Sequence, residues 1–336
     1  MNRDPSPKRS LSLRSQAFRG LVFQVVVVGL VAFGVWYLAH NTLANMQARG
    51  IRSGFDFLVQ PAGFDIGESL IPYDSMNAYW KAFLVGILNT LRVAIVGIVL
   101  ATILGGLIGI GRFSRNAIVR GICYAYVEWF RNIPVLLQLL MWYLLFAEYL
   151  PPLLEAPSLG GVIYLSKSGL SFPVPTWTAD IGFAWSIPRP EGFVMEGGVS
   201  ASPEFLAVLM GLVLYTSAFI AEVVRAGLAS VPRGQVEAAA SLSLSRTQII
   251  RLVIMPQALR VIIPPLTSQY LNLTKNSSLA VAIGYPDVVS IATTALNNTG
   301  RAVECIAIVM AVFLATSLST SAFMNWYNKR AAIRER

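Results

Sequence analysis

The sequence predicts an all-α integral membrane protein with about six transmembrane helices. Of its 336 residues, 55% are hydrophobic and only 13% are charged, about half the charged fraction of a typical soluble domain. Several apolar runs reach the roughly 20 residues that a helix needs to cross a bilayer. The charged residues between these runs also segregate by sign along the chain. Together these observations exclude a soluble globular domain.

The N-terminal part of the chain predicts a basic arm followed by a membrane helix. Residues 1–19 carry five basic side chains among prolines and serines. The apolar run over 20–40 is long enough to span, and no Ala-x-Ala-type cleavage site follows it. We therefore expect a retained transmembrane helix over 20–40 and an acidic outer loop over 41–82.

Two further spans are predicted over 83–110 and 122–146. The second of these contains Pro134 inside one expected helix. The first carries a stripe of small residues, which is typical of close helix packing. The residues of this stripe recur every four positions: Gly97, Ala101, Gly105 and Gly109.

The C-terminal half predicts a long outer loop and three more spans. The loop, 147–203, is rich in Pro, Gly and Ser. The spans are expected over 205–226, 257–273 and 305–323, with a basic tail over 326–336. Adjacent Pro264 and Pro265 should break the span that contains them. Short additional segments within 83–129 or 147–203 would raise the number of spans to eight.

The distribution of charge predicts the orientation in the membrane. One side of the layout, which includes both termini and residues 225–260, carries 17 basic and 3 acidic residues, against 7 basic and 12 acidic on the other. Basic residues mark the cytoplasmic side. Both termini should therefore be cytoplasmic, and the net charge of +9 needs no nucleic-acid partner to explain it. The single histidine and two cysteines predict neither histidine catalysis nor a metal cluster.

The stretch between Pro232 and Pro256 predicts two short helices beside the membrane. Residues 233–243 favour a helix that is too short and too polar to cross a bilayer. Ser245 and Gln248 have the spacing of a capping box. A second helix should therefore begin there and end before Pro256, so that the pair forms a projecting corner.

This stretch resembles the EAA loop of ABC-transporter permeases, which docks the ATPase subunit. Glu237, Ala238 and Ala239 match its signature, and Pro256 closes it at the family's spacing. Ser243 stands where that family usually has glycine, which leaves the geometry of the corner open. The resemblance implies a set of ATPase-coupling residues: Gly234, Glu237, Ala238, Ala239, Ser243 and Pro256.

The resemblance also implies a fold, a substrate class and partners. It covers 83–325 and implies the type-I ABC importer permease fold, a five-helix core preceded by an extra N-terminal helix. The run Tyr126–Pro134 is similar to the polar amino-acid branch, and Gly160–Leu170 to the Q-type subunits of general L-amino-acid permeases. The implied partners are ATPase subunits, a second homologous permease subunit and a periplasmic amino-acid-binding protein, in a Gram-negative inner membrane.

Two functions are weighed, an ATP-driven importer and an ion-coupled secondary transporter. The chain has no Gly-Lys pair and therefore no phosphate-binding loop, so ATP would bind to a partner and this chain would carry no cofactor. A secondary transporter usually shows inverted repeats and mid-membrane carboxylates. Glu128 and Glu222 each precede an arginine by three positions and are expected to form intrahelical ion pairs. We therefore favour the importer, and no nucleophile–base set or metal spacing indicates an enzyme.

Polar residues inside the spans are candidates for the substrate path. A zwitterion must exchange its hydration for fixed polar groups while it crosses the membrane. The alternative for each residue is a hydrogen bond to a neighbouring helix, or a side chain that reaches outward to the interface. The candidates are Asn89, Arg92, Gln138, Tyr215, Thr216, Gln269, Asn272 and Lys275.

Overall fold

The computed structural model describes residues 16–48, 50, 53–178, 182–192 and 194–331. The chain divides into two compact units, one up to Phe55 and one from Asp56 onward. Most of the predicted basic arm, residues 1–15, lies outside the described residues. The helices after α1 (Gln16–Ala48) are α2 (Tyr79–Gly111), α3 (Ala117–Asn132), α4 (Val135–Tyr149), α5 (Pro203–Ala229), α6 (Arg233–Ser241), α7 (Arg246–Gln248), α8 (Met255–Asn276), α9 (Val288–Thr299) and α10 (Ala302–Ala331).

The first unit consists mainly of α1. Its apolar side chains are exposed along nearly the whole helix, and residues 18–46 have the length and hydropathy of a membrane span. The aromatic rings of Phe33, Trp36 and Tyr37 lie against one another on its surface. A helix whose central residues are apolar on every side and exposed is suited to a lipid environment.

The second unit has α2 and α5 at its centre, and α4 and α8 pack against α5. The small residues predicted to form a packing stripe on α2 make this contact possible. A Cβ atom on Gly105 would lie 2.7 Å from the side chain of Ile220 and from the carbonyl oxygen of Ser217, and one on Gly109 would lie 2.8 Å from that of Ala221. Neither position has room for a larger residue, so the packing role of this stripe is confirmed.

The expectation of one continuous helix over 122–146 is wrong. Two helices, α3 and α4, replace it, and they are bent by 103° at the short break between them. Pro134 causes the break because it lacks an N–H group, and it is the N-cap residue of α4. The freed carbonyl groups of Phe130 and Ile133 both accept hydrogen bonds from Nε2 of Gln138, at 2.9 Å.

The expected break at Pro264 and Pro265 is also wrong, because α8 continues through both prolines. The helix that follows Ser245 does not end before Pro256 either. It runs from α7 through a π-helical turn, η3 (Ile249–Ile254), directly into α8. The second helix of the projecting corner and the next span are therefore one continuous element.

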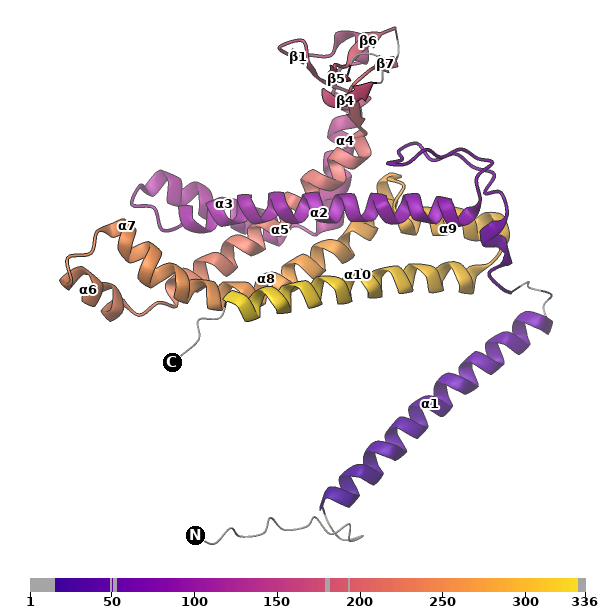
Figure 1. Ribbon diagram of the computed structural model, residues 1–336, viewed down its shortest axis with the longest axis horizontal. Coiled ribbons are helices and arrows are strands. Elements are labelled where there is room, and N and C mark those ends of the chain that lie inside the picture. Colours follow the sequence, from indigo (N-terminus) through magenta and orange to yellow (C-terminus); the bar gives the residue numbers. More distant parts are fainter. Residues whose placement is uncertain (1–15, 49, 51–52, 179–181, 193, 332–336) are drawn as a thin grey trace. The chain divides into compact units, whose positions relative to one another are not determined.

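The long outer loop contains short β-strands that the sequence did not predict. One antiparallel sheet has the order β1-β2-β3-β8, and two hairpins pair β4 with β5 and β6 with β7. Figure 1 shows these strands gathered beyond the end of α4. Their bounds are β1 (Ser158–Leu159), β2 (Ile163–Ser166), β3 (Gly169–Phe172), β4 (Val174–Thr178), β5 (Gly182–Ser186), β6 (Arg189–Glu191), β7 (Val194–Glu196) and β8 (Val199–Ala201).

The remaining elements complete the bundle. Among the described residues, five helices are long and apolar enough to cross a membrane, or up to six when the bent pair counts as one span. The last helix, α10, extends to Ala331 and so includes half of the predicted tail. The helix α9 and the 3-10 helices η1 (Asp56–Val59), η2 (Leu153–Glu155) and η4 (Ser277–Ile283) were not predicted. In Figure 1, α6 and α7 lie at the opposite end of α2 from α9.

Candidate functional site

The projecting corner, residues 233–254, is called here the knob. Its first helix, α6, has only nine residues, and Glu237 and Ala238 are exposed on it. Ala239 is 5% exposed and faces the knob's own interior. Gly234 lies in open space, with nothing within 4 Å of where a Cβ atom would stand. Gly234, Glu237 and Ala238 are therefore accessible, whereas Ala239 is packed inside.

The corner after α6 is closed by backbone hydrogen bonds. The N–H of Ser243 donates to the carbonyl of Ala240 at 2.9 Å, and the N–H of Leu244 donates to that of Ala239 at 3.4 Å. These two bonds define a Schellman motif, whose turning residue takes a left-handed conformation and is usually glycine. That residue is Ser243, with φ of 58°. Serine therefore adopts the conformation for which glycine is preferred.

The second half of the knob begins with the predicted capping box, which is confirmed. The backbone N–H of Gln248 donates to Oγ of Ser245 at 3.4 Å, and the backbone N–H of Ser245 donates to Oε1 of Gln248 at 2.8 Å. Leu242 and Leu252 are 76% and 61% exposed around this corner. Two large apolar side chains are therefore exposed on the knob, on either side of its capping box.

An ion-pair cluster joins the end of α2 to α5, shortly before the chain enters the knob. Glu222 on α5 accepts from Arg112, at the end of α2, and from Nε of Arg225 at 3.0 Å. The predicted pair between Glu222 and Arg225 is therefore confirmed. The one predicted for Glu128 is wrong, because the guanidinium of Arg131 lies over the ring of Phe219 instead, 5.1 Å from its centre.

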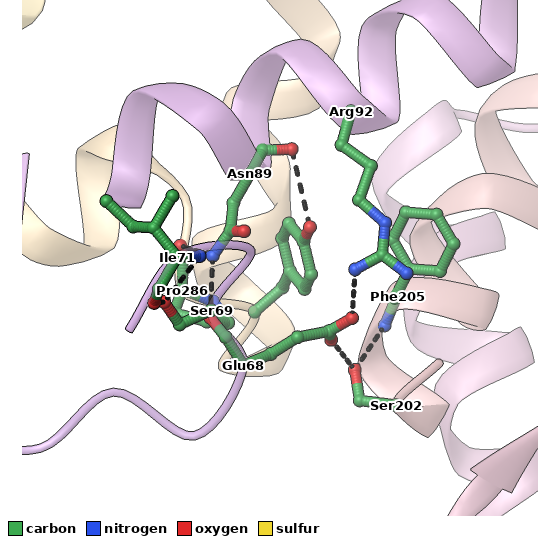
Figure 2. A network of polar contacts seen from close by, with 9 residues as sticks. Glu68, Ser69, Ile71, Asn89, Arg92, Ser202, Phe205 and Pro286 are labelled. Atoms are coloured by element: carbon green, nitrogen blue, oxygen red, sulfur yellow. Dashed lines mark hydrogen bonds and ion pairs between the residues drawn. The ribbon is translucent and has the colours of Figure 1, made fainter. Parts of the chain in front are cut away.

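At the opposite end of α2, residues from distant parts of the chain form the distal polar cluster: Glu68, Asn89, Arg92, Ser202 and Tyr285. The two carboxylate oxygens of Glu68 accept from Arg92 and from the hydroxyl of Ser202. Nδ2 of Asn89 donates to the carbonyl groups of Glu68 and Pro286, each at 2.9 Å. Figure 2 shows these side chains converging from α2, from the loop before it and from the start of α5.

Asp287 lies beside this cluster, between η4 and α9. Its Oδ1 accepts from the backbone N–H of Ser290 at 2.8 Å and so caps α9. The side chain is fully buried, and its Oδ2 has no hydrogen-bond partner in the part of the chain that the structure describes. Burial raises the pKa of this carboxyl to about 7, although backbone hydrogen bonds from Ser290 and Val289 oppose the shift. Within the described part of the chain, no group of three or more potential metal ligands comes together.

Comparison with known proteins identifies the family. The profile described as "Binding-protein-dependent transport system inner membrane component" matches residues 97–333. The chain belongs to this family. The matched residues include the knob, α5 and α8, and the residues before 97 lie outside the match.

Relatives of similar length carry amino-acid transport names. The permease is 42% identical to "General L-amino acid transport system permease protein AapQ" of Rhizobium johnstonii, over 95% of this chain and 94% of the relative. It is also 42% identical to "Putative amino-acid ABC transporter permease protein YhdX" of Escherichia coli K12, over the whole of both chains. The solved structure titled "Crystal structure of an amino acid ABC transporter with histidines" superposes with a TM-score of 0.55 at 23% identity, over 75% of this chain and 95% of that one. The permease therefore has the type-I ABC importer permease fold.

The predicted path residues do not form one cluster. Asn89 and Gln138 are buried and donate to backbone carbonyl groups in two separate places. Thr216 is also buried, and the ring of Tyr215 lies 4.9 Å from that of Phe219. In contrast, Asn272 and Lys275 are exposed on α8, and Gln269 is half-buried. The residues on α2, α4 and α5 therefore contact their own bundle. In contrast, Asn272 and Lys275 face away from it.

Sequence reasoning missed Glu68 as the partner of Arg92, and with it Ser202 and Tyr285 of the same cluster. These three residues lie in loops or at helix ends, where polar residues attract no notice. The signal was Arg92 itself, since an arginine inside an apolar span requires a counter-ion. The nearest acidic residues in the sequence are those of the preceding loop, which contains Glu68.

Proposed function

We propose that this permease is one membrane subunit of an ATP-driven importer that moves L-amino acids from the periplasm to the cytoplasm. The observation that carries the proposal is the knob, a rigid corner that exposes Glu237 and Ala238 beside the apolar side chains of Leu242 and Leu252. The amino-acid names of two relatives that match the permease over almost its full length support the substrate class.

The knob is proposed to transmit the ATPase cycle. Small side chains on α6 let a groove of an ATPase subunit close around the helix, and Glu237 can pair with a basic residue of that groove. Ala239 contributes from inside, because it allows α6 to pack closely on the rest of the knob. The continuous path from η3 into α8 would carry a movement of the knob into a span without an intervening hinge.

The orientation is proposed from charge. The knob and both termini belong to the side that carries most of the basic residues, which is the cytoplasmic side of a bacterial inner membrane. The distal polar cluster is then periplasmic, where a soluble amino-acid-binding protein would deliver its ligand. Cysteines introduced at Ser243 and at Ser168 test this orientation in intact cells, because an impermeant thiol reagent should label only position 168.

A second, homologous permease subunit is proposed to cover one face of α8. Pro264, Pro265, Ser268, Asn272 and Lys275 are all exposed in this chain. Their spacing places them on one side of the helix, and polar groups there are costly against lipid. A partner subunit, with a water-filled substrate path between the two, would satisfy them. Asn272 and Lys275 then remain candidates for the path, together with half-buried Gln269.

The experiment that tests the proposal is a charge reversal, Glu237→Lys, in the assembled transporter. Amino-acid uptake should fall at least tenfold, and co-purification of the ATPase should weaken, while the amount of permease in the membrane stays unchanged. Glu191→Lys, an exposed charge reversal in β6, is the matched control and should leave uptake intact. Normal uptake and normal ATPase retention in the Glu237 variant would rule out the docking role.

A further inference from the structure

The distal polar cluster holds the Glu68 carboxylate with groups that also bind free carboxylates. One oxygen accepts from the guanidinium of Arg92 and the other from the hydroxyl of Ser202. Ser202 is the N-cap of α5, a helix of 27 residues, and the positive end of a helix favours a negative charge. The guanidinium is held in position by the ring of Phe205, 4.0 Å away. An arginine and a helix N-terminus thus converge on one carboxylate.

The same carboxylate lines an open cavity. The cavity has a volume of about 400 Å³, and its wall includes Asp65, Glu68, Ser202, Glu204 and Pro286. This volume falls within the range of about 300–1,000 Å³ that is typical of small-molecule sites. A ligand in the cavity would meet Glu68 and Ser202, with the carboxylates of Asp65 and Glu204 in the same wall. Arg92 does not line the cavity itself, and its guanidinium is paired with the Glu68 carboxylate that does.

The backbone of Glu68 is held independently of its carboxylate. Asn89 donates to the carbonyl of Glu68 at 2.9 Å, and nothing lies within 4 Å of where a Cβ atom on the preceding Gly67 would stand. Oδ1 of Asn89 is buried and has no hydrogen-bond partner among the described residues. Figure 2 shows Asn89 beside Glu68 and Arg92. The cluster therefore contains a buried acceptor that no described group satisfies.

We propose that Arg92 and Ser202 form a binding site for the carboxylate of a free α-amino acid, and that Glu68 occupies this site when no ligand is present. The incoming carboxylate takes the places of the two Glu68 oxygens. The neighbouring carboxylates of Glu204 and Asp65 then accept the ammonium group of the ligand. This proposal rests on the proposed function for its ligand class, and it adds an entry site at the distal end of the bundle.

An ion pair that only anchors the loop would respond differently to mutation. Removing either partner of a purely structural pair should impair the protein in the same direction. A competitor and a receptor should instead give effects of opposite sign. Glu68→Gln keeps the shape of the side chain but weakens the internal competitor, whereas Arg92→Lys keeps the positive charge but loses the paired donors of the guanidinium.

The test is calorimetric titration of the full-length permease, assembled with its ATPase subunits in lipid nanodiscs. The probe is L-alanine, and ethylamine serves as the same molecule without the carboxylate. For Glu68→Gln we expect the apparent affinity for L-alanine to rise about tenfold, since the competing state is depopulated. For Arg92→Lys we expect it to fall about tenfold, as expected for a lost charge-assisted contact. Glu155→Gln, an exposed change outside the cavity, should match the wild type, and ethylamine should not displace L-alanine.

Weaker or unchanged binding by the Glu68→Gln variant would overturn the proposal, even if the Arg92→Lys variant failed to assemble. Displacement of L-alanine by ethylamine would also overturn it. Uptake driven by ATP and the binding protein is measured in parallel with the same preparations. Normal uptake without the opposite effects on affinity would remove the entry site and leave the transport function standing, whereas loss of wild-type uptake would count against the transport function itself.

Discussion

The knob and the distal polar cluster occupy opposite ends of α2 and are built in opposite ways. The knob is made from residues close together in sequence, and its turn is defined by hydrogen bonds between Ala239, Ala240, Ser243 and Leu244. The distal cluster joins residues up to 197 positions apart, through the bond from Asn89 to Pro286. Local bonding produces a small unit that can present its surface to a partner. Long-range bonding instead connects several elements and leaves its polar groups facing one another.

This difference predicts that the structure of the knob is most sensitive to substitution of Ala239, which is packed against the rest of the knob. Ala239→Asp places a carboxylate where the side chain is 5% exposed, which costs several kcal/mol, roughly 2–7, without a partner. We expect the hydrogen exchange of the α6 amides to accelerate strongly and amino-acid uptake to be lost. Ala240→Asp, at an exposed position on the same helix, is the control and should leave exchange unchanged. Equal exchange in both variants would show that the packing of α6 does not hold the knob together.

The distal cluster should be most sensitive to loss of its bridging amide. Asn89→Leu removes the donor to the carbonyl groups of Glu68 and Pro286, and each buried group left unpaired costs about 1–3 kcal/mol. A decrease of several degrees in the thermal midpoint of the detergent-solubilised permease is expected. Asn272→Leu, an exposed site on α8, should change the midpoint little. A larger effect at Asn272 would contradict the structural role assigned to Asn89.

The stability of the permease should depend on pH through Asp287, which lies beside the distal polar cluster. Because burial raises the pKa of Asp287 from 3.8 to about 7, the folded state binds more protons than the unfolded state between these values. Stability should therefore decrease as the pH rises from about 4 to about 7 and then level off. Asp287→Asn should weaken this dependence, which can be measured from thermal midpoints across pH. An unchanged pH profile in the variant would show that Asp287 does not cause the effect.

The smallest expected effect lies at the corner of the knob. Ser243 has a left-handed conformation, φ 58°, which costs an L-residue roughly 1–2 kcal/mol. Ser243→Gly should therefore stabilise the α6–α7 corner by about 1 kcal/mol, observed as slower local hydrogen exchange. Ser243→Val should have the opposite effect, because a β-branched residue disfavours this conformation. A stabilising valine would mean that the corner is not under backbone strain.

Local signals explain what could be predicted from the sequence. The apolar runs predicted the spans, the four-residue spacing of Gly105 and Gly109 predicted close packing, and Ser245 with Gln248 predicted a helix start. The Glu-Ala-Ala spacing indicated the family and the docking stretch. Each of these features depends on residues within a few turns of one another, and helix formation, capping and hydropathy act over that range.

Only the tertiary structure decided how these elements combine. Pro134 ends a helix, whereas Pro264 and Pro265 remain inside one, since the consequence of a proline depends on whether surrounding groups can satisfy the freed carbonyls. At the bend between α3 and α4, the side-chain amide of Gln138 donates hydrogen bonds to these carbonyls. Glu68 contacts Arg92 and Ser202 only because the loop before α2, α2 itself and the start of α5 meet in the bundle. The contacts of Glu68 depend on the positions of residues that are distant in sequence, and the energy of a buried charge is set by the neighbours that folding places around it.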